Sequence, residues 1–91
     1  MATVSFTPNL EGALGCRLGA QQVQGASVAA ALEEVFAVHP RLRGYILDDQ
    51  GALRKHVAVF LDGSNIGDRQ SLSDALPEDG ELFVAQALSG G

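Results

Sequence analysis

A single amphipathic stripe constrains the fold of this chain more than any other feature. Apolar side chains recur at spacings of three and four residues at Val28, Leu32, Val35 and Phe36, with His39 at the end of the stripe. Ser27 is a good N-cap, because its hydroxyl can accept a hydrogen bond from the first helical turn. Pro40 disfavours helical geometry at the residue before it. The sequence therefore predicts one helix over residues 28–38, and no other segment shows such a stripe.

Short strands are predicted on both sides of this helix. Residues 2–7 alternate between apolar and polar side chains, and a weakly marked second strand ends near Val23, after a loop over residues 9–20. Beyond the helix, strands are predicted at residues 45–47, 57–61 and 81–87, and a short return strand begins near Ile66. Residues 48–51, 62–63 and 78–80 are expected to form turns, and residues 71–76 one helical turn.

The predicted order of elements is β-β-α-β-β-β with a single helix. Such an order favours an α+β fold with two layers, in which a mixed sheet of four to five strands packs on one main helix. A chain of 91 residues has room for one hydrophobic core. We expect residues 1–87 to form one domain and residues 88–91 to be a flexible tail.

The charge of the chain limits its partners. Eleven acidic and six basic residues give a net charge of -5, whereas nucleic acids and anionic membranes bind clustered Lys and Arg. We therefore expect no nucleic-acid partner and no membrane partner. A protein with a basic docking face remains compatible with this charge.

Cysteine and histidine usage argues against a metal site or a disulfide. Cys16 is the only cysteine, and His39 and His56 are the only histidines, without cysteine at ligand spacing. The sequence does not begin with a basic segment followed by an apolar run, so we expect no secretory signal. The sequence favours a cytoplasmic domain without a bound metal.

Two of the predicted strands are apolar on both faces. Alternation places Val57, Val59 and Leu61 on one face of their strand and Ala58 and Phe60 on the other. The last strand repeats the pattern, with Leu82 and Val84 opposed to Phe83 and Ala85. A sheet covered by one helix is expected to be polar on its other face.

Two explanations of the second apolar face remain open. Loops over residues 9–20 or 63–77 could fold over Phe60 and Phe83. Alternatively, Phe60, Phe83, Ala85 and Ala58 form an exposed patch that binds a protein partner, as such patches commonly do. We expect the second arrangement.

The chain ends in Ser89-Gly90-Gly91, directly after the last predicted strand. Two residues without side chains form a thin segment that can enter a narrow site, and glycine adopts backbone angles closed to other residues. Terminal glycines can also be mere disordered ends. The strand before them and the single helix upstream favour a functional tail.

These features together resemble the MoaD/ThiS family of ubiquitin-like sulfur carriers. The similarity covers nearly the whole chain and rests on five segments: the opening T-V-S-F, the helix at 28–38, the segment H-V-A-V-F-L-D-G over residues 56–63, the E-D-G-E turn over residues 78–81, and the closing L-F-V-A-Q-A-L-S-G-G. The ends of the molybdopterin synthase small subunit and of CysO-like carriers look similar, although this chain lacks their prolines. The resemblance implies a ubiquitin-like β-grasp fold.

The resemblance also implies a mechanism. Gly91 would be adenylated by an E1-like (MoeB/ThiF-type) enzyme, which binds the ATP, and sulfur would then replace AMP to give a C-terminal thiocarboxylate. A sulfur-acceptor synthase subunit would be the second partner. Gly90 would allow passage into the activating site, and Leu88 and Ser89 would contact it. The chain would bind no cofactor, and it would be a protein cosubstrate rather than an enzyme.

Two other functions stay open. A ubiquitin-like modifier would form isopeptide bonds through Gly91, starting from the same adenylate. A non-catalytic β-grasp interaction module would use neither Gly90 nor Gly91. The pathway that receives the sulfur (cysteine, molybdopterin or a related one) is not encoded in these residues.

Overall fold

The computed structural model describes residues 1–7 and 19–86. Most of the predicted loop at 9–20, together with Cys16, lies outside the described residues, as do residues 87–91. The elements along the chain are β1 (Ala2–Phe6), β2 (Gln21–Val23), α2 (Val28–Val38), α3 (Leu42–Ile46), β3 (Val57–Leu61), β4 (Ser64–Asn65) and β5 (Glu81–Gln86).

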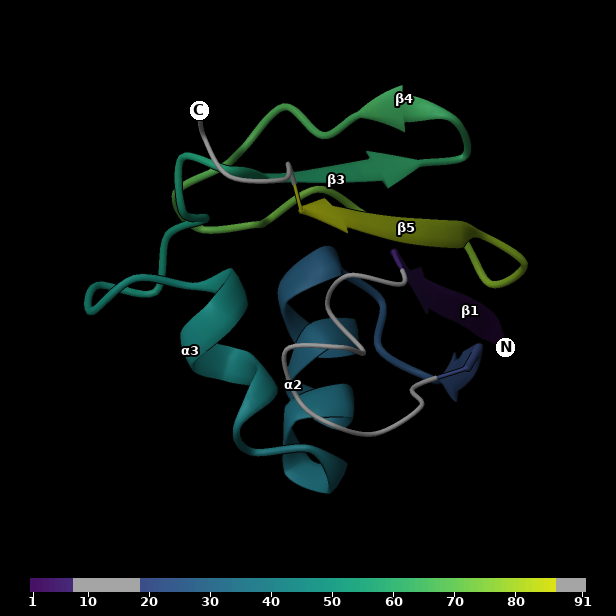
Figure 1. Ribbon diagram of the computed structural model, residues 1–91. Helices are drawn as coiled ribbons and strands as arrows, with labels where there is room; N and C mark the ends of the chain where they lie inside the picture. Colours follow the sequence, from purple (N-terminus) through teal and green to yellow (C-terminus); the bar gives the residue numbers. More distant parts are fainter. Residues whose placement is uncertain (8–18, 87–91) are drawn as a thin grey trace.

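The five strands form one mixed sheet in the order β2-β1-β5-β3-β4. β5 is central: it pairs in parallel with β1 and antiparallel with β3. β2 and β4 complete the sheet as antiparallel neighbours of β1 and β3. Figure 1 shows the sheet as one layer, with α2 and α3 as the second layer on one of its faces. The predicted α+β architecture with a mixed sheet is therefore confirmed.

The main helix begins and ends where the sequence predicts. The Ser27 hydroxyl accepts a hydrogen bond from the Ala30 N–H at 3.1 Å, and α2 ends at Val38. The Glu34 carboxylate accepts hydrogen bonds from the backbone N–H groups of Gln24 and Gly25. Because Glu34 lies on α2, these bonds attach the end of β2 to the helix.

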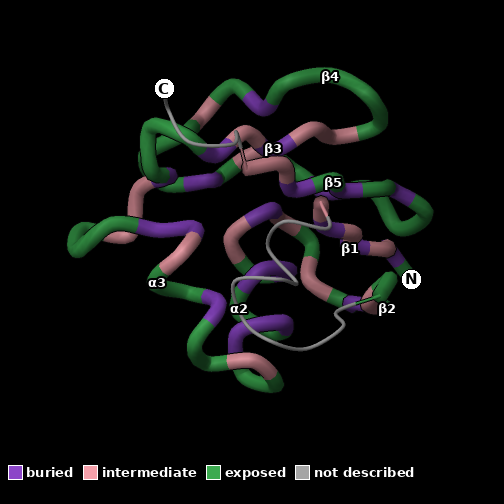
Figure 2. The backbone as a smooth tube through the Cα atoms, viewed as in Figure 1, coloured by how far each residue is buried: buried purple, intermediate pink, exposed green. Residues whose placement is uncertain are grey.

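The hydrophobic core lies between the helix and one face of the sheet. Figure 2 shows the buried residues gathered between these two layers. The buried residues of α2 and those of the central strands belong to one cluster. The helix contributes its apolar stripe, and the strands contribute the apolar residues of one face, as the sequence predicts. The core residues on these elements are Val4, Val28, Ala31, Leu32, Val35, Phe36, Val57, Val59, Leu82 and Val84.

The strand predicted at residues 45–47 is wrong, because a second helix, α3, occupies Leu42–Ile46. Leu42 and Ile46 lie four residues apart on one helical face, and both are fully buried. The Arg43 guanidinium forms an ion pair with Glu33 at 2.6 Å and lies 5.6 Å from the ring centroid of Phe36, so α3 is attached to α2. These tertiary contacts stabilise a helix too short to be read from the sequence.

The helical turn predicted at residues 71–76 is also wrong. Leu72 has a positive φ of 54°, which no right-handed helix contains. The Asp68 carboxylate accepts hydrogen bonds from the backbone N–H groups of Ser71 and Ser73 in this segment, in place of helical carbonyls. Ala75 forms a single bridge with Ser27, which holds the segment against the start of α2.

The predicted turns are confirmed, with one shift in the return strand. Asp62 and Gly63 adopt φ values of 49° and 87°, which suit a two-residue turn between antiparallel strands. The return strand β4 consists of Ser64–Asn65 and thus ends before Ile66, where the sequence predicts its start. Neither helix among the described residues is long and apolar enough to cross a membrane.

Candidate functional site

An apolar strip crosses the open face of the sheet, on the two strands where the sequence predicts it. In the antiparallel pairing of β3 with β5, Ala58 lies opposite Ala85 and Phe60 lies opposite Phe83. We call these four residues the apolar strip. The residues between them on both strands are at most 1% exposed, because they point to the helical layer. The strip therefore faces away from α2.

The strip is accessible. Phe83 keeps 42% of its surface exposed, and the other three residues of the strip are partly exposed. Residues 63–77 thus do not bury Phe83, which argues against one of the two covering loops considered from the sequence. The other covering loop, at 9–20, lies mostly outside the described residues.

A hollow of about 490 Å³ opens at the β3–β4 end of the strip. The Asp62 and Glu81 carboxylates lie at this end. The two residues are joined by two hydrogen bonds of 2.9 Å: the Asp62 N–H donates to the Glu81 carbonyl, and the Glu81 N–H donates to Oδ1 of the Asp62 side chain. The residues that line the hollow are Ser5, Phe60, Asp62, Gly63, Glu81, Leu82 and Phe83.

The other end of the strip leads to the predicted tail. Gln86, the last described residue, pairs with Val57 at the start of β3. Lys55 and His56 precede Val57 and are exposed. The predicted reacting residue Gly91 and the predicted tail contacts Leu88, Ser89 and Gly90 lie outside the described residues.

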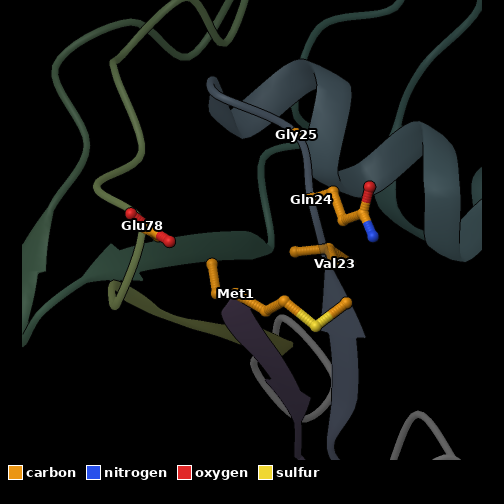
Figure 3. A pocket seen from close by; sticks show the side chains of 6 residues that line it. Met1, Val23, Gln24, Gly25 and Glu78 are labelled. Atoms are coloured by element: carbon orange, nitrogen blue, oxygen red, sulfur yellow. The ribbon is translucent and has the colours of Figure 1, made fainter.

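A second hollow, of about 300 Å³, lies near the start of the chain. Met1 and Val23 line it together with Glu78, and Figure 3 shows Glu78 across the opening from Val23 and Gln24. Ala2 and Gly25 complete its lining. Glu78 is the one acidic side chain in this lining, so the hollow offers no pair of carboxylates for acid–base chemistry.

The carboxylate of Asp68 has a structural role that the sequence does not predict. The N–H of Ser71 and the hydroxyl and N–H of Ser73 donate to it, as does the N–H of Gln70. Hydrogen bonds to the charged form lower the pKa of Asp68 from 3.8 to about 2, the backbone bond from Ser71 most of all. The pattern Asp-x-x-Ser, typical of side-chain to backbone turns, is the signal that could have identified it.

No metal-binding cluster occurs in the described part of the chain, where no three His, Cys, Asp or Glu residues are grouped as ligands. His39 follows α2 as its C-cap residue, and its backbone N–H donates to the carbonyl of Val35. His56 lies in the turn before β3. The two histidines are thus on different elements.

Comparison with known proteins supports the fold through structure rather than sequence. No protein-family model matches the chain, and no curated protein sequence does. The crystal structure of SAMP1 from Haloferax volcanii has a TM-score of 0.77 at 27% identity, covering 99% of this chain and 98% of that one. A chain of the BexX/CysO complex from Amycolatopsis orientalis has a TM-score of 0.83 at 19% identity over the full length of both. CysO from Mycobacterium tuberculosis has a TM-score of 0.80 at 17% identity, covering 97% of this chain and all of that one.

The chain is a ubiquitin-like β-grasp protein. Its structural neighbours are ubiquitin-like proteins of the MoaD/ThiS type, so the resemblance found in the sequence is confirmed. In this β-grasp protein the apolar strip lies on the two strands that meet the end of the described chain. The site therefore combines an accessible apolar surface with the strand that leads to the predicted tail.

Proposed function

We propose that this β-grasp protein is a sulfur carrier. An E1-like enzyme would bind the apolar strip and take the tail into its active site. There the Gly91 carboxylate would attack the α-phosphate of ATP, releasing pyrophosphate and forming an acyl-adenylate. A sulfur nucleophile would then displace AMP and leave a thiocarboxylate on Gly91.

One observation carries this proposal: the apolar strip runs along β5 towards Gln86, the last described residue, after which the chain continues to the predicted tail at 88–91. β5 is held by β1 on one side and by β3 on the other. A partner that binds the strip is thus placed at a fixed position relative to the start of the tail. The protein itself would supply no general base, so it acts as a cosubstrate of the activating enzyme.

Mass spectrometry tests the proposal directly. The 91-residue chain is incubated with the E1-like enzyme of its own organism, ATP and sulfide, and the intact mass is measured. A sulfur carrier gains the mass of one oxygen-to-sulfur exchange, and the gain disappears when Gly90 and Gly91 are deleted. An unchanged mass with every E1-like enzyme of that organism would refute the proposal.

A ubiquitin-like modifier is the second candidate, because SAMP1 from Haloferax volcanii, at 27% identity, belongs to the proteins named small archaeal modifiers. In that case an amine of a target protein, rather than sulfur, displaces AMP from Gly91. A tagged chain purified under denaturing conditions distinguishes the two. Covalent adducts with many proteins favour the modifier, and a single thiocarboxylated species favours the carrier.

A non-catalytic interaction module is the third candidate. It would use the apolar strip to bind a partner but would not need the tail. Deleting Gly90 and Gly91 would then leave its cellular function intact, whereas both adenylate-dependent functions would be lost.

A further inference from the structure

The acidic end of the apolar strip has unsatisfied charge. Glu81 and Phe83 lie two residues apart on β5, so both side chains are on the open face of the sheet. None of the seven residues around the hollow is basic. In the described part of the chain, no ion pair and no side-chain hydrogen bond is formed by the Glu81 carboxylate.

The Asp62 carboxylate adds to this negative charge. One of its oxygens, Oδ1, accepts the N–H of Glu81, which fixes the carboxylate beside β5. Two carboxylates at one end of an apolar surface create a local negative potential, and a cation that enters gains from both. On these observations we infer that the hollow receives an arginine side chain of the protein that docks on the apolar strip. This inference rests on the proposed function, because it names the chemistry of that docking partner.

Arginine fits the hollow better than lysine for two reasons. A planar guanidinium can bind carboxylates through two parallel hydrogen bonds, whereas an ammonium is a point charge. A guanidinium also stacks on aromatic rings, and the exposed ring of Phe83 and that of Phe60 line the same hollow as the carboxylates. The partner's arginine would thus contact carboxylate and ring together.

The position of the hollow gives the partner an orientation. Glu81 and Gln86 are the first and last residues of β5. They are five residues apart, or about 17 Å at the usual rise of a strand. Lys55 and His56 lie at the Gln86 end, so the two ends of the strip differ in charge. A partner with its arginine in the hollow therefore has Gln86, from which the chain continues to the predicted tail, about 17 Å away.

A small probe tests the hollow without any partner. The ¹⁵N-labelled protein is titrated with N-acetyl-arginine methylamide and, separately, with the neutral analogue N-acetyl-citrulline methylamide. We expect amide shifts at Gly63, Glu81 and Phe83 that are several-fold larger with the arginine probe. In D62N/E81Q these shifts should fall to the citrulline level. Equal shifts with both probes, or no shifts on β3 and β5, would overturn the inference.

Kinetics with the activating enzyme test the same contact in its functional setting. The D62N/E81Q variant should raise the KM for the protein substrate about tenfold and change kcat little, because the lost contact lies far from the reacting carboxylate. The matched control D49N/E78Q also removes two exposed carboxylates, neither of which lines this hollow, and should leave KM unchanged. A KM for D62N/E81Q equal to that of the wild type would contradict the inference.

The two proposals fail in different ways. If the wild-type chain is never adenylated, the proposed function is wrong, while the NMR titration still decides whether the hollow binds a guanidinium. If the wild type is adenylated but D62N/E81Q behaves as the control does, the function stands and the arginine contact is wrong. Asn is well accommodated at the positive φ of residue 62, so the D62N change preserves the turn.

Discussion

Phe60 and Phe83 lie directly opposite each other on β3 and β5, with both side chains on the face of the sheet that α2 does not cover. Cross-strand aromatic pairs stabilise a sheet only modestly. Their neighbours Val59 and Val84, which also lie opposite each other, are fully buried and belong to the core. The same two strands thus carry the core on one face and the candidate docking surface on the other.

Phe83→Ala should weaken docking much more than folding. We expect a loss of about 0.2–1 kcal/mol in the free energy of unfolding, because the side chain is largely a cross-strand contact. The KM for adenylation should rise about tenfold or more, as is usual for an exposed aromatic anchor at an interface. Val38→Ala truncates another exposed apolar side chain, at the end of α2, and should alter neither value. An unchanged KM for Phe83→Ala would exclude the apolar strip as the docking surface.

The low pKa of Asp68 predicts how stability depends on pH. Because the folded state lowers this pKa from 3.8 to about 2, the stabilisation is complete above pH 3.8 and is lost as the pH falls towards 2. Asp68→Asn should therefore lower the urea midpoint at neutral pH, and the difference from the wild type should shrink in strong acid. Circular dichroism at both pH values measures this. Asp49→Asn removes one exposed charge from the turn after α3 and is the control, with an unchanged urea midpoint expected at neutral pH.

The sequence predicts the apolar strip well because its signal is local. Alternation along a strand decides which side chains share a face, so the sequence alone is enough to group the four residues of the apolar strip. The pairing that brings Phe60 next to Phe83 needs in addition that β3 and β5 are neighbours and that their register is the observed one. The alternation does not predict the charged hollow. The hollow also depends on Asp62, which lies beyond the end of β3, and the turn at this residue brings its carboxylate beside Glu81.

The two incorrect elements fail for non-local reasons. The helix α3 depends on burial of Leu42 and Ile46 against the rest of the core, and five residues give no periodic pattern of their own. The segment at 71–76 has the composition of a helical turn, but the Asp68 carboxylate binds its backbone N–H groups at Ser71 and Ser73. In both segments tertiary contacts, rather than local propensity, decide the structure.

Gly25→Ala should destabilise the protein because the backbone passes very close to α2. An added Cβ would lie 2.7 Å from the backbone nitrogen of Ala31 and 2.8 Å from the carbonyl carbon of Ala30. Relief requires a backbone shift, and we expect a cost of about 1–3 kcal/mol, typical of overpacking. Gly44→Ala is the matched control, since nothing lies within 4 Å of its added Cβ in α3. It should stabilise the helix by about 0.5–1 kcal/mol. Equal urea midpoints for the two variants would contradict this account.

Gly90→Val should separate docking from activation. The substitution lies beyond β5, so we expect the free energy of unfolding to stay within about 0.5 kcal/mol of the wild type. A branched side chain beside the terminal carboxylate should keep the tail out of a narrow channel, so no adenylate forms. The apolar strip is unchanged, however, and the variant should still occupy the activating enzyme. It is therefore expected to inhibit adenylation of the wild type competitively.

The double variant Gly90→Val/Phe83→Ala should inhibit about tenfold more weakly, since it lacks the Phe83 anchor as well. Adenylation of Gly90→Val at the wild-type rate would show that the last glycines do not control entry into the activating site.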